Sequence, residues 1–286
     1  MSYYKILGFK KEPFSTSPDP MFFYESREHD MALTNLMIEL RLKRGLAVIL
    51  GDVGTGKTTL SRKLYQLIKS EDGFICHMML DPVYNDEEVF LTSLTRNFDV
   101  EPGNDGPQIL NLKEALERFL FQQGVEANKT IVLIIDEAQK LNELTLECLR
   151  VLLNYETNEY KLLQLVLLGQ MELHSKLMNI PNFIDRISFK YTLNPLNESE
   201  TRRMIEFRIR QAGYNSNMNL FLDTALKAIY QHTRGYPRRV NMLCHKALKQ
   251  LVMRNKFFVD EELIRAIIEE DIQQGLHWDR QPTVVR

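Results

Sequence analysis

A strand-length apolar run, a glycine-rich loop and a helical segment follow one another over residues 46–69. Residues 46–50 are apolar throughout, which predicts a buried strand. Beyond the loop, apolar residues recur at helical spacing, at Leu60, Leu64, Leu67 and Ile68. Between these segments, residues 51–58 read Gly-Asp-Val-Gly-Thr-Gly-Lys-Thr, a pattern that predicts phosphate binding when a strand precedes it and a helix follows. The flanks disfavour the alternative, a glycine-rich turn with a chance lysine.

The loop carries the groups that a nucleoside triphosphate requires. Its glycines allow backbone N–H groups to point at phosphate oxygens, and the N-terminus of the next helix adds partial positive charge. Lys57 is placed to reach the β- and γ-phosphates, and the Thr58 hydroxyl is placed to ligate Mg²⁺. The predicted phosphate-binding residues are Gly51, Asp52, Val53, Gly54, Thr55, Gly56, Lys57, Thr58 and Thr59.

A second strand-length run ends in two carboxylates. Residues 131–135 are all apolar, which predicts a strand covered on both faces, as in a parallel sheet. Asp136 and Glu137 follow it, at the position where ligands bind in open α/β sheets. We therefore expect Asp136 to hold Mg²⁺ and Glu137 to orient or deprotonate the attacking water. The second acid favours hydrolysis over phosphoryl transfer to another substrate. The alternative, that both acids only cap the next helix, is weakened by the glycine loop.

Strands and helices alternate through the first two thirds of the chain. This alternation predicts an α/β fold with a doubly wound parallel sheet. The expected strands are residues 46–50, 74–80, 131–135, 162–168 and 189–193, and the expected helices are residues 28–44, 59–69, 86–97, 109–123 and 142–155.

Only helices are expected from about Pro195 onward, over residues 199–212, 220–233, 237–255 and 260–274. The pattern thus predicts an α/β core followed by a small all-α lid. We divide the chain into an N-terminal linker (1–30), a nucleotide-binding core (31–194), a helical lid (195–274) and a tail (275–286).

Charge is distributed unevenly along the chain. The formal net charge is only −2, which gives no overall attraction to nucleic acid. Between Leu196 and Asp260, however, twelve Lys and Arg face five Asp and Glu. This excess is explained either by a solvated charged surface or by a surface that faces phosphates, of a nucleotide or of nucleic acid. No apolar run is long enough for a membrane span, and three scattered cysteines are typical of a reducing compartment, so we expect a cytoplasmic protein.

Four ordered motifs resemble those of a known family. They are Gly-Asp-Val-Gly-Thr-Gly-Lys-Thr-Thr (51–59), Ile-Ile-Asp-Glu-Ala-Gln (134–139), Leu-Leu-Gly-Gln (167–170) and Gly-Tyr-Pro-Arg-Arg-Val-Asn-Met-Leu-Cys (235–244). The set is similar to that of the AAA+ ATPases, and specifically to the branch typified by general secretion pathway protein A. The N-terminal segment from Tyr4 to Pro20 also resembles that branch.

The resemblance implies ATP as the nucleotide and roles for further residues. Gln170 falls at the sensor-1 position, where many relatives have Asn. Arg238 matches the sensor-2 arginine that brings the charge of the lid onto the phosphates, with Arg239 as the near alternative. Arg186 is the candidate for an arginine finger that reaches the nucleotide of a neighbouring subunit.

The resemblance also implies a function and partners. We expect a homo-oligomeric ring or filament whose ATP hydrolysis drives assembly of a partner complex, such as a secretion, pilus or polysaccharide system of the envelope. Such a protein would lie in the cytoplasm, or at the inner membrane through a partner that supplies the anchor. The alternative is a regulator of transposition that binds double-stranded DNA, which the basic lid favours and the near-neutral total charge does not.

Overall fold

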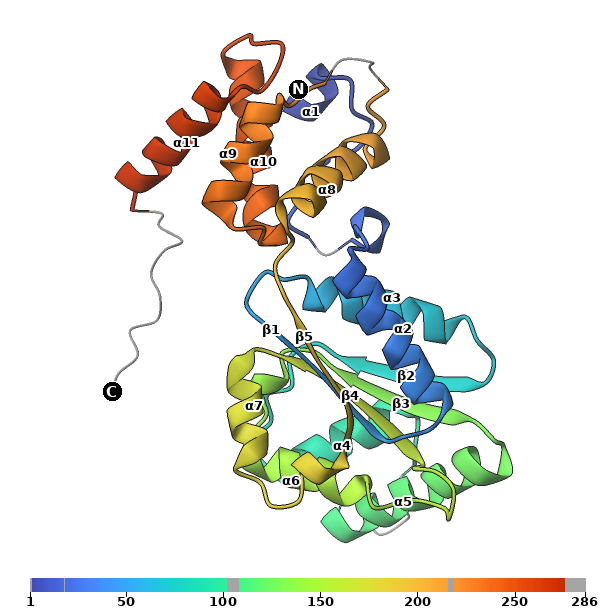
Figure 1. The fold of residues 1–286 in the computed structure, drawn as a ribbon. Helices are drawn as coiled ribbons and strands as arrows, with labels where there is room; N and C mark the ends of the chain where they lie inside the picture. Colours follow the sequence, from blue (N-terminus) through green and yellow to red (C-terminus); the bar gives the residue numbers. More distant parts are fainter. Residues whose placement is uncertain (1, 18, 102–107, 216–218, 276–286) are drawn as a thin grey trace. The chain divides into compact units, whose positions relative to one another are not determined.

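The computed structural model describes residues 2–17, 19–101, 108–215 and 219–275, which form two compact units (Figure 1). The α/β unit comprises residues 27–194. The helical unit combines the described residues of the first 26 with those from Pro195 onward. The expected tail lies, apart from Gly275, outside the described residues.

Five parallel strands form the sheet of the α/β unit, in the order β2-β3-β4-β1-β5. This confirms the α/β fold class with a parallel sheet. Because β1, β3 and β4 are covered on both faces, every residue of these three strands is buried, as their mainly apolar sequences predict. The strands are β1 (Leu46–Gly51), β2 (Phe74–Met79), β3 (Thr130–Ile135), β4 (Leu163–Gly169) and β5 (Ile187–Leu193).

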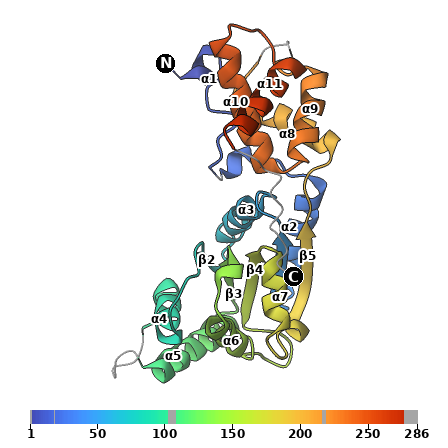
Figure 2. The ribbon, with the colours of Figure 1, turned by 90° about the vertical axis from the view of Figure 1, so that its left-hand side faces the viewer.

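Helices cover both faces of this sheet, and the pleat decides which strand residues meet which helices. Alternate residues of β1, β3 and β4, such as Val48, Leu133 and Leu165, join one apolar core with α4, α5, α6 and α7. Helices α2 and α3 lie against the other face (Figure 1), and α2 packs against β5, beside which it lies in Figure 2. The helices are α2 (Arg27–Arg41), α3 (Lys57–Lys69), α4 (Glu87–Asn97), α5 (Ile109–Phe121), α6 (Glu143–Leu152) and α7 (Met171–Met178), with short helical turns η2 (Gln122–Glu126), η3 (Ala138–Lys140) and η4 (Ile184–Arg186).

Helix α7 is the main element that the sequence pattern missed. It is only eight residues long, and its apolar face rests on the two buried residues Leu173 and Leu177. Such a short stripe gives little periodicity, because two turns of helix offer only a few positions on one face.

The helical unit contains the expected four helices and a second apolar core. The N-terminal segment belongs to this unit, because Phe9, Phe14 and Phe22 are buried in the same core as residues of α8 to α11. The helices are α1 (Tyr3–Ile6), η1 (Pro20–Phe22), α8 (Glu198–Gln211), α9 (Asp223–Thr233), α10 (Pro237–Met253) and α11 (Glu261–Gln273).

A buried arginine attaches the N-terminal segment to α8. The Arg208 guanidinium donates hydrogen bonds to the carbonyl oxygens of Pro13 (2.8 Å), Ser15 (3.0 Å) and Phe22 (3.0 Å). Burial lowers the pKa of Arg208 to about 10, so the side chain stays charged at neutral pH. Three carbonyl dipoles thus solvate a cation that water would solvate in the unfolded chain.

The glycine of the Gly-Tyr-Pro-Arg motif is required by backbone geometry. Gly235 has φ +74°, and a Cβ atom at this position would lie 1.8 Å from the carbonyl oxygen of Leu196. The backbone N–H of Leu196 donates to the Gly235 carbonyl at 3.0 Å, which brings the two segments this close. Gly235 therefore sets the entry into α10 by its lack of a side chain.

We expect Gly235→Ala to destabilise the helical unit much more than Gly275→Ala. Both glycines have φ +74°, but nothing lies within 4 Å of a Cβ at Gly275. Gly275→Ala is the matched control, because it carries only the left-handed backbone strain of about 1–2 kcal/mol. The difference in free energy of unfolding between the two variants therefore measures the clash with the Leu196 carbonyl. Hydrogen exchange of the α8–α11 amides measures both costs, and equal costs would contradict the steric explanation.

We also expect Arg208→Met to lower the free energy of unfolding of the helical unit by about 3 kcal/mol, because it leaves three buried carbonyls without donors. The control is Arg210→Met, which removes an exposed ion pair with Glu206 and should cost less than about 0.5 kcal/mol. If hydrogen exchange gives the same loss of unfolding free energy for both variants, Arg208 does not attach the N-terminal segment.

Candidate nucleotide site

The glycine loop joins β1 to α3 in a conformation that needs glycine. Gly54 and Gly56 have φ of 87° and 104°, in the left-handed region that other residues rarely adopt. Gly56 caps α3, and a Cβ there would lie 2.8 Å from Nε2 of the buried His29. The His29 Nε2 also lies within hydrogen-bonding distance, 3.0 Å, of the Thr55 carbonyl oxygen. Helix α2 therefore supports the loop from outside the motif.

Lys57 is the first residue of α3 and is buried, with 5% of its surface exposed. Its Nζ donates to the loop carbonyls of Gly51 (2.7 Å) and Asp52 (2.9 Å). Burial lowers the pKa of the ammonium, and the nearby carboxylates of Glu137 and Asp136 oppose this effect. The loop thus holds a cation at the carboxyl end of β1.

Asp136 follows β3 directly and is 1% exposed. Its Oδ1 accepts a hydrogen bond from the Glu137 backbone N–H at 3.0 Å, and its carboxylate is hydrogen-bonded to the Thr58 side chain. Burial raises the pKa of Asp136, while the hydrogen bond from Thr58 and the charge of Lys57 lower it.

Two groups that can ligate a metal through oxygen, the hydroxyl of Thr58 and the carboxylate of Asp136, therefore lie together at the carboxyl edge of the sheet. They suit Mg²⁺, which prefers hard oxygen ligands and is commonly bound by one or two carboxylates together with substrate phosphates. The described residues contain no group of three or more His, Cys, Asp or Glu that could hold a metal by itself. The donor set fits a cation shared with a bound nucleotide.

Glu137 adopts an unusual backbone conformation, with φ 53° and ψ 34°. A non-glycine residue in this region carries about 1–3 kcal/mol of strain, so its surroundings must hold it there. The Glu137 Oε2 accepts a hydrogen bond of 2.7 Å from the Gln139 side-chain amide. Of the acids that act on Lys57, Glu137 has the largest effect.

Gln170 follows β4 and precedes α7, at the same edge of the sheet. Its side chain is half-buried, and its backbone N–H donates to the side-chain oxygen of Gln139 at 3.1 Å. The predicted loop residues, Asp136, Glu137 and Gln170 are therefore gathered where β1, β3 and β4 end.

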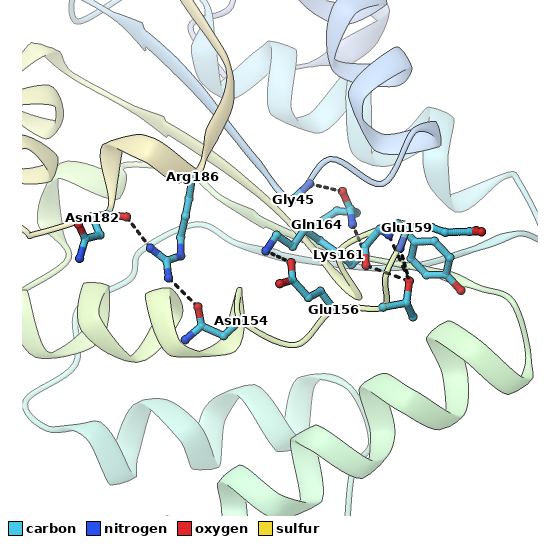
Figure 3. Close-up of polar contacts among 10 residues, drawn as sticks. Gly45, Asn154, Glu156, Glu159, Lys161, Gln164, Asn182 and Arg186 are labelled. Carbon is cyan, nitrogen blue, oxygen red and sulfur yellow. Dashed lines mark hydrogen bonds and ion pairs between the residues drawn. The ribbon is translucent and has the colours of Figure 1, made fainter.

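Arg186 does not join this group. It precedes β5 and so lies at the opposite, amino edge of the parallel sheet. Figure 3 shows its guanidinium donating to the Asn182 carbonyl (2.5 Å) and to Oδ1 of Asn154 (2.6 Å). Arg238 and Arg239 belong to the helical unit, in the first turn of α10, where Arg238 is exposed and Arg239 stacks on the Tyr236 ring.

The sequence analysis did not predict the contacts that three residues make around the site. His29 supports the glycine loop, and Gln139 connects Glu137 with Gln170. Lys176 of α7 donates from Nζ to the backbone carbonyls of Gln139 and Leu141. The only sequence signal for any of them is the position of Gln139 inside the run 134–139, because single polar residues on helices carry no motif.

The region that holds this site is similar to known proteins. The model of a family described as an AAA domain matches residues 40–177, which include the glycine loop, Asp136, Glu137 and Gln170. General secretion pathway protein A of Aeromonas hydrophila is 35% identical over 248 residues, which are 86% of this chain and 44% of that protein. The chain thus spans less than half the length of this relative. A potential ATP-binding protein of Staphylococcus aureus is 26% identical over 39% of this chain and 40% of its own length.

Solved structures share the fold at low sequence identity. Cdc6p from Pyrobaculum aerophilum has a TM-score of 0.66 at 18% identity, covering 88% of this chain and 70% of its own. The Thermotoga maritima RuvB Holliday junction branch migration motor has a TM-score of 0.58 at 16% identity, covering 87% and 73%. At these identities the likeness concerns the fold.

The fold, the order of the motifs and the extended similarity to the Aeromonas protein agree with one another. The chain therefore belongs, through the AAA domain at residues 40–177, to the AAA+ ATPases, and over 86% of its length it is similar to general secretion pathway protein A.

Proposed function

We propose that this protein hydrolyses ATP at interfaces between its own subunits and uses the resulting change to assemble or remodel an envelope complex, of the secretion, pilus or polysaccharide type. The observation that carries the hydrolytic part is the gathering of Asp136 and Glu137 beside Lys57 at one edge of the sheet. The envelope part is supported by the similarity to a general secretion pathway protein over 86% of the chain.

Each predicted site residue at the carboxyl edge of the sheet has a proposed role. Lys57 exchanges its bonds to the Gly51 and Asp52 carbonyls for bonds to the β- and γ-phosphates. Thr58 and Asp136 would hold Mg²⁺, which would supply positive charge to the phosphates. Glu137 orients the attacking water and accepts its proton, and Gln170 faces the γ-phosphate from the end of β4.

Arg186 and Arg238 have proposed tasks from outside this edge. Strands of six to seven residues separate the amino edge of the sheet from the carboxyl edge, a span of about 20 Å. Arg186 therefore lies far from the nucleotide site of its own subunit, and we propose that it serves the site of a neighbour in a ring or filament. Arg238 would add a second guanidinium to the phosphates from the helical unit.

The partners of the basic residues in the helical unit bear on the choice between an envelope client and DNA. Several of the basic residues between Leu196 and Asp260 have internal partners, which leaves less charge for phosphates of a nucleic acid. Arg208 is buried against carbonyls, and ion pairs hold Arg202 to Asp223, Arg210 to Glu206, Lys246 to Asp271 and Lys256 to Asp260. We therefore favour the envelope function and keep duplex DNA as the alternative partner.

Localisation follows from this choice of client. No helix in the described part of the chain is long and apolar enough to cross a bilayer. We propose that the protein works on the cytoplasmic side of the inner membrane and reaches it through the partner that it assembles.

We expect Glu137→Gln to reduce ATP turnover about 10²-fold or more while ATP affinity is kept, because the amide cannot accept the proton of the attacking water. Steady-state turnover and nucleotide binding are measured with and without duplex DNA. Stimulation by DNA that disappears in the variant would favour the transposition alternative. In the producing organism, Glu137→Gln should deplete the membrane fraction of one assembled envelope complex, and an unchanged fraction would count against the envelope client.

We expect Arg186→Ala to lower turnover about 10³-fold, as loss of an arginine finger does, and to be rescued by mixing with Glu137→Gln subunits. The mixture contains interfaces with an intact Glu137 on one subunit and an intact Arg186 on the next. Arg150→Ala, which removes a surface ion pair with Glu147, is the control and should keep its turnover. Absence of recovery in the mixture would show that Arg186 does not act between subunits.

A further inference from the structure

We propose that Gln139 is the positioning residue for Glu137, and that it aligns this carboxylate with the end of β4. The proposal rests on the role given above to Glu137 as the residue that activates water. It assigns to Gln139 no contact with the nucleotide.

The side-chain amide of Gln139 uses both of its ends. Its Nε2 donates to Oε2 of Glu137 at 2.7 Å, and its Oε1 accepts from the backbone N–H of Gln170 at 3.1 Å. One planar group thus connects the turn after β3 with the turn after β4. The distance between these two hydrogen-bonded groups is set by the rigid amide, since its oxygen and nitrogen are held on one carbon.

The backbone around Gln139 is held as well. Its carbonyl oxygen accepts a hydrogen bond from Nζ of Lys176, which also binds the carbonyl of Leu141 at 3.1 Å. Gly169 leaves room for the amide, because a Cβ there would lie 3.2 Å from Oε1 of Gln139 and 2.7 Å from Cδ2 of Leu173. The amide therefore occupies a fitted place between η3, β4 and α7.

The geometry favours a role of Gln139 in positioning Glu137 over a role in holding Glu137 inactive. The hydrogen bond from Gln139 leaves Glu137 in the site, where its carboxylate affects Lys57 more than any other acid does. The bond also fixes a residue whose backbone is strained, at φ 53°. Because the same amide binds Gln170, a displacement of the β4 end on nucleotide binding would move Glu137 with it.

Neither leucine nor glutamate at position 139 reproduces both bonds. Leucine is of comparable size but has neither donor nor acceptor, and glutamate keeps the acceptor while placing a second negative charge beside Glu137. Gln139→Leu removes both connections, and Gln139→Glu removes the bond to Glu137 while the one to Gln170 can persist.

We expect Gln139→Leu to lower kcat about ten- to a hundred-fold with little change in KM for ATP, because a misplaced Glu137 affects the transition state and not ground-state binding. Gln139→Glu should lose at least as much. The matched control is Gln164→Leu, since Gln164 is also a glutamine whose amide bridges two segments. It accepts from the Gly45 N–H (2.8 Å) and donates to the Lys161 carbonyl (2.7 Å) at the amino edge of the sheet (Figure 3). This control should reduce stability and keep kcat.

A second readout needs no turnover. In ¹⁵N-labelled protein without nucleotide, the side-chain amide signals of Gln139 and Gln164 are assigned by their loss in the leucine variants. Glu137→Ala should shift the Gln139 signals and leave those of Gln164 in place. Unshifted Gln139 signals would overturn the proposal, as would a Gln139→Leu enzyme with the kcat of Gln164→Leu. Full turnover in Glu137→Gln would instead remove the role of Glu137 itself.

Discussion

Parallel pairing of β1, β3 and β4 is the constraint on which the rest of the α/β unit depends. In the register of the sheet, Leu50 of β1 lies opposite Gly169 of β4, and Ile135 of β3 lies opposite Leu167 of β4. Since all strands run the same way, the three segments that follow them must emerge at one edge. The phosphate loop, the Asp136–Glu137 pair and Gln170 meet for this reason, although up to about 120 residues separate them in the chain.

The same constraint puts charged groups into a poorly solvated place. Burial disfavours the charged forms of both Lys57 and Asp136, and each is compensated by hydrogen bonds and by the opposite charge. Such compensation suits a site for a highly charged ligand, because the groups that phosphate and Mg²⁺ would contact are already oriented. Contacts from α2, η3 and α7 complete this arrangement through His29, Gln139 and Lys176.

The helical unit follows a different principle. Its core combines the N-terminal segment with helices that come almost 200 residues later, and Arg208 fixes the segment by binding three carbonyls. The excess of basic residues in this region is therefore partly structural. Gly235 shows the same for the Gly-Tyr-Pro-Arg motif, whose first residue is required by the close approach of the Leu196 carbonyl, whatever Arg238 does.

Local sequence patterns were enough to predict the strand–loop–helix around Lys57, the strand that ends at Asp136 and the change from mixed to purely helical structure. These features are local, because a buried strand gives a continuous run of apolar residues and a buried helix face gives apolar residues at helical spacing. No local pattern predicts the short helix α7 or the contacts of Gln139, His29 and Arg208, which form only in the folded chain. Their partners are backbone groups or single side chains brought close by the fold, and a lone polar residue leaves no periodic signal of the contact that it will make.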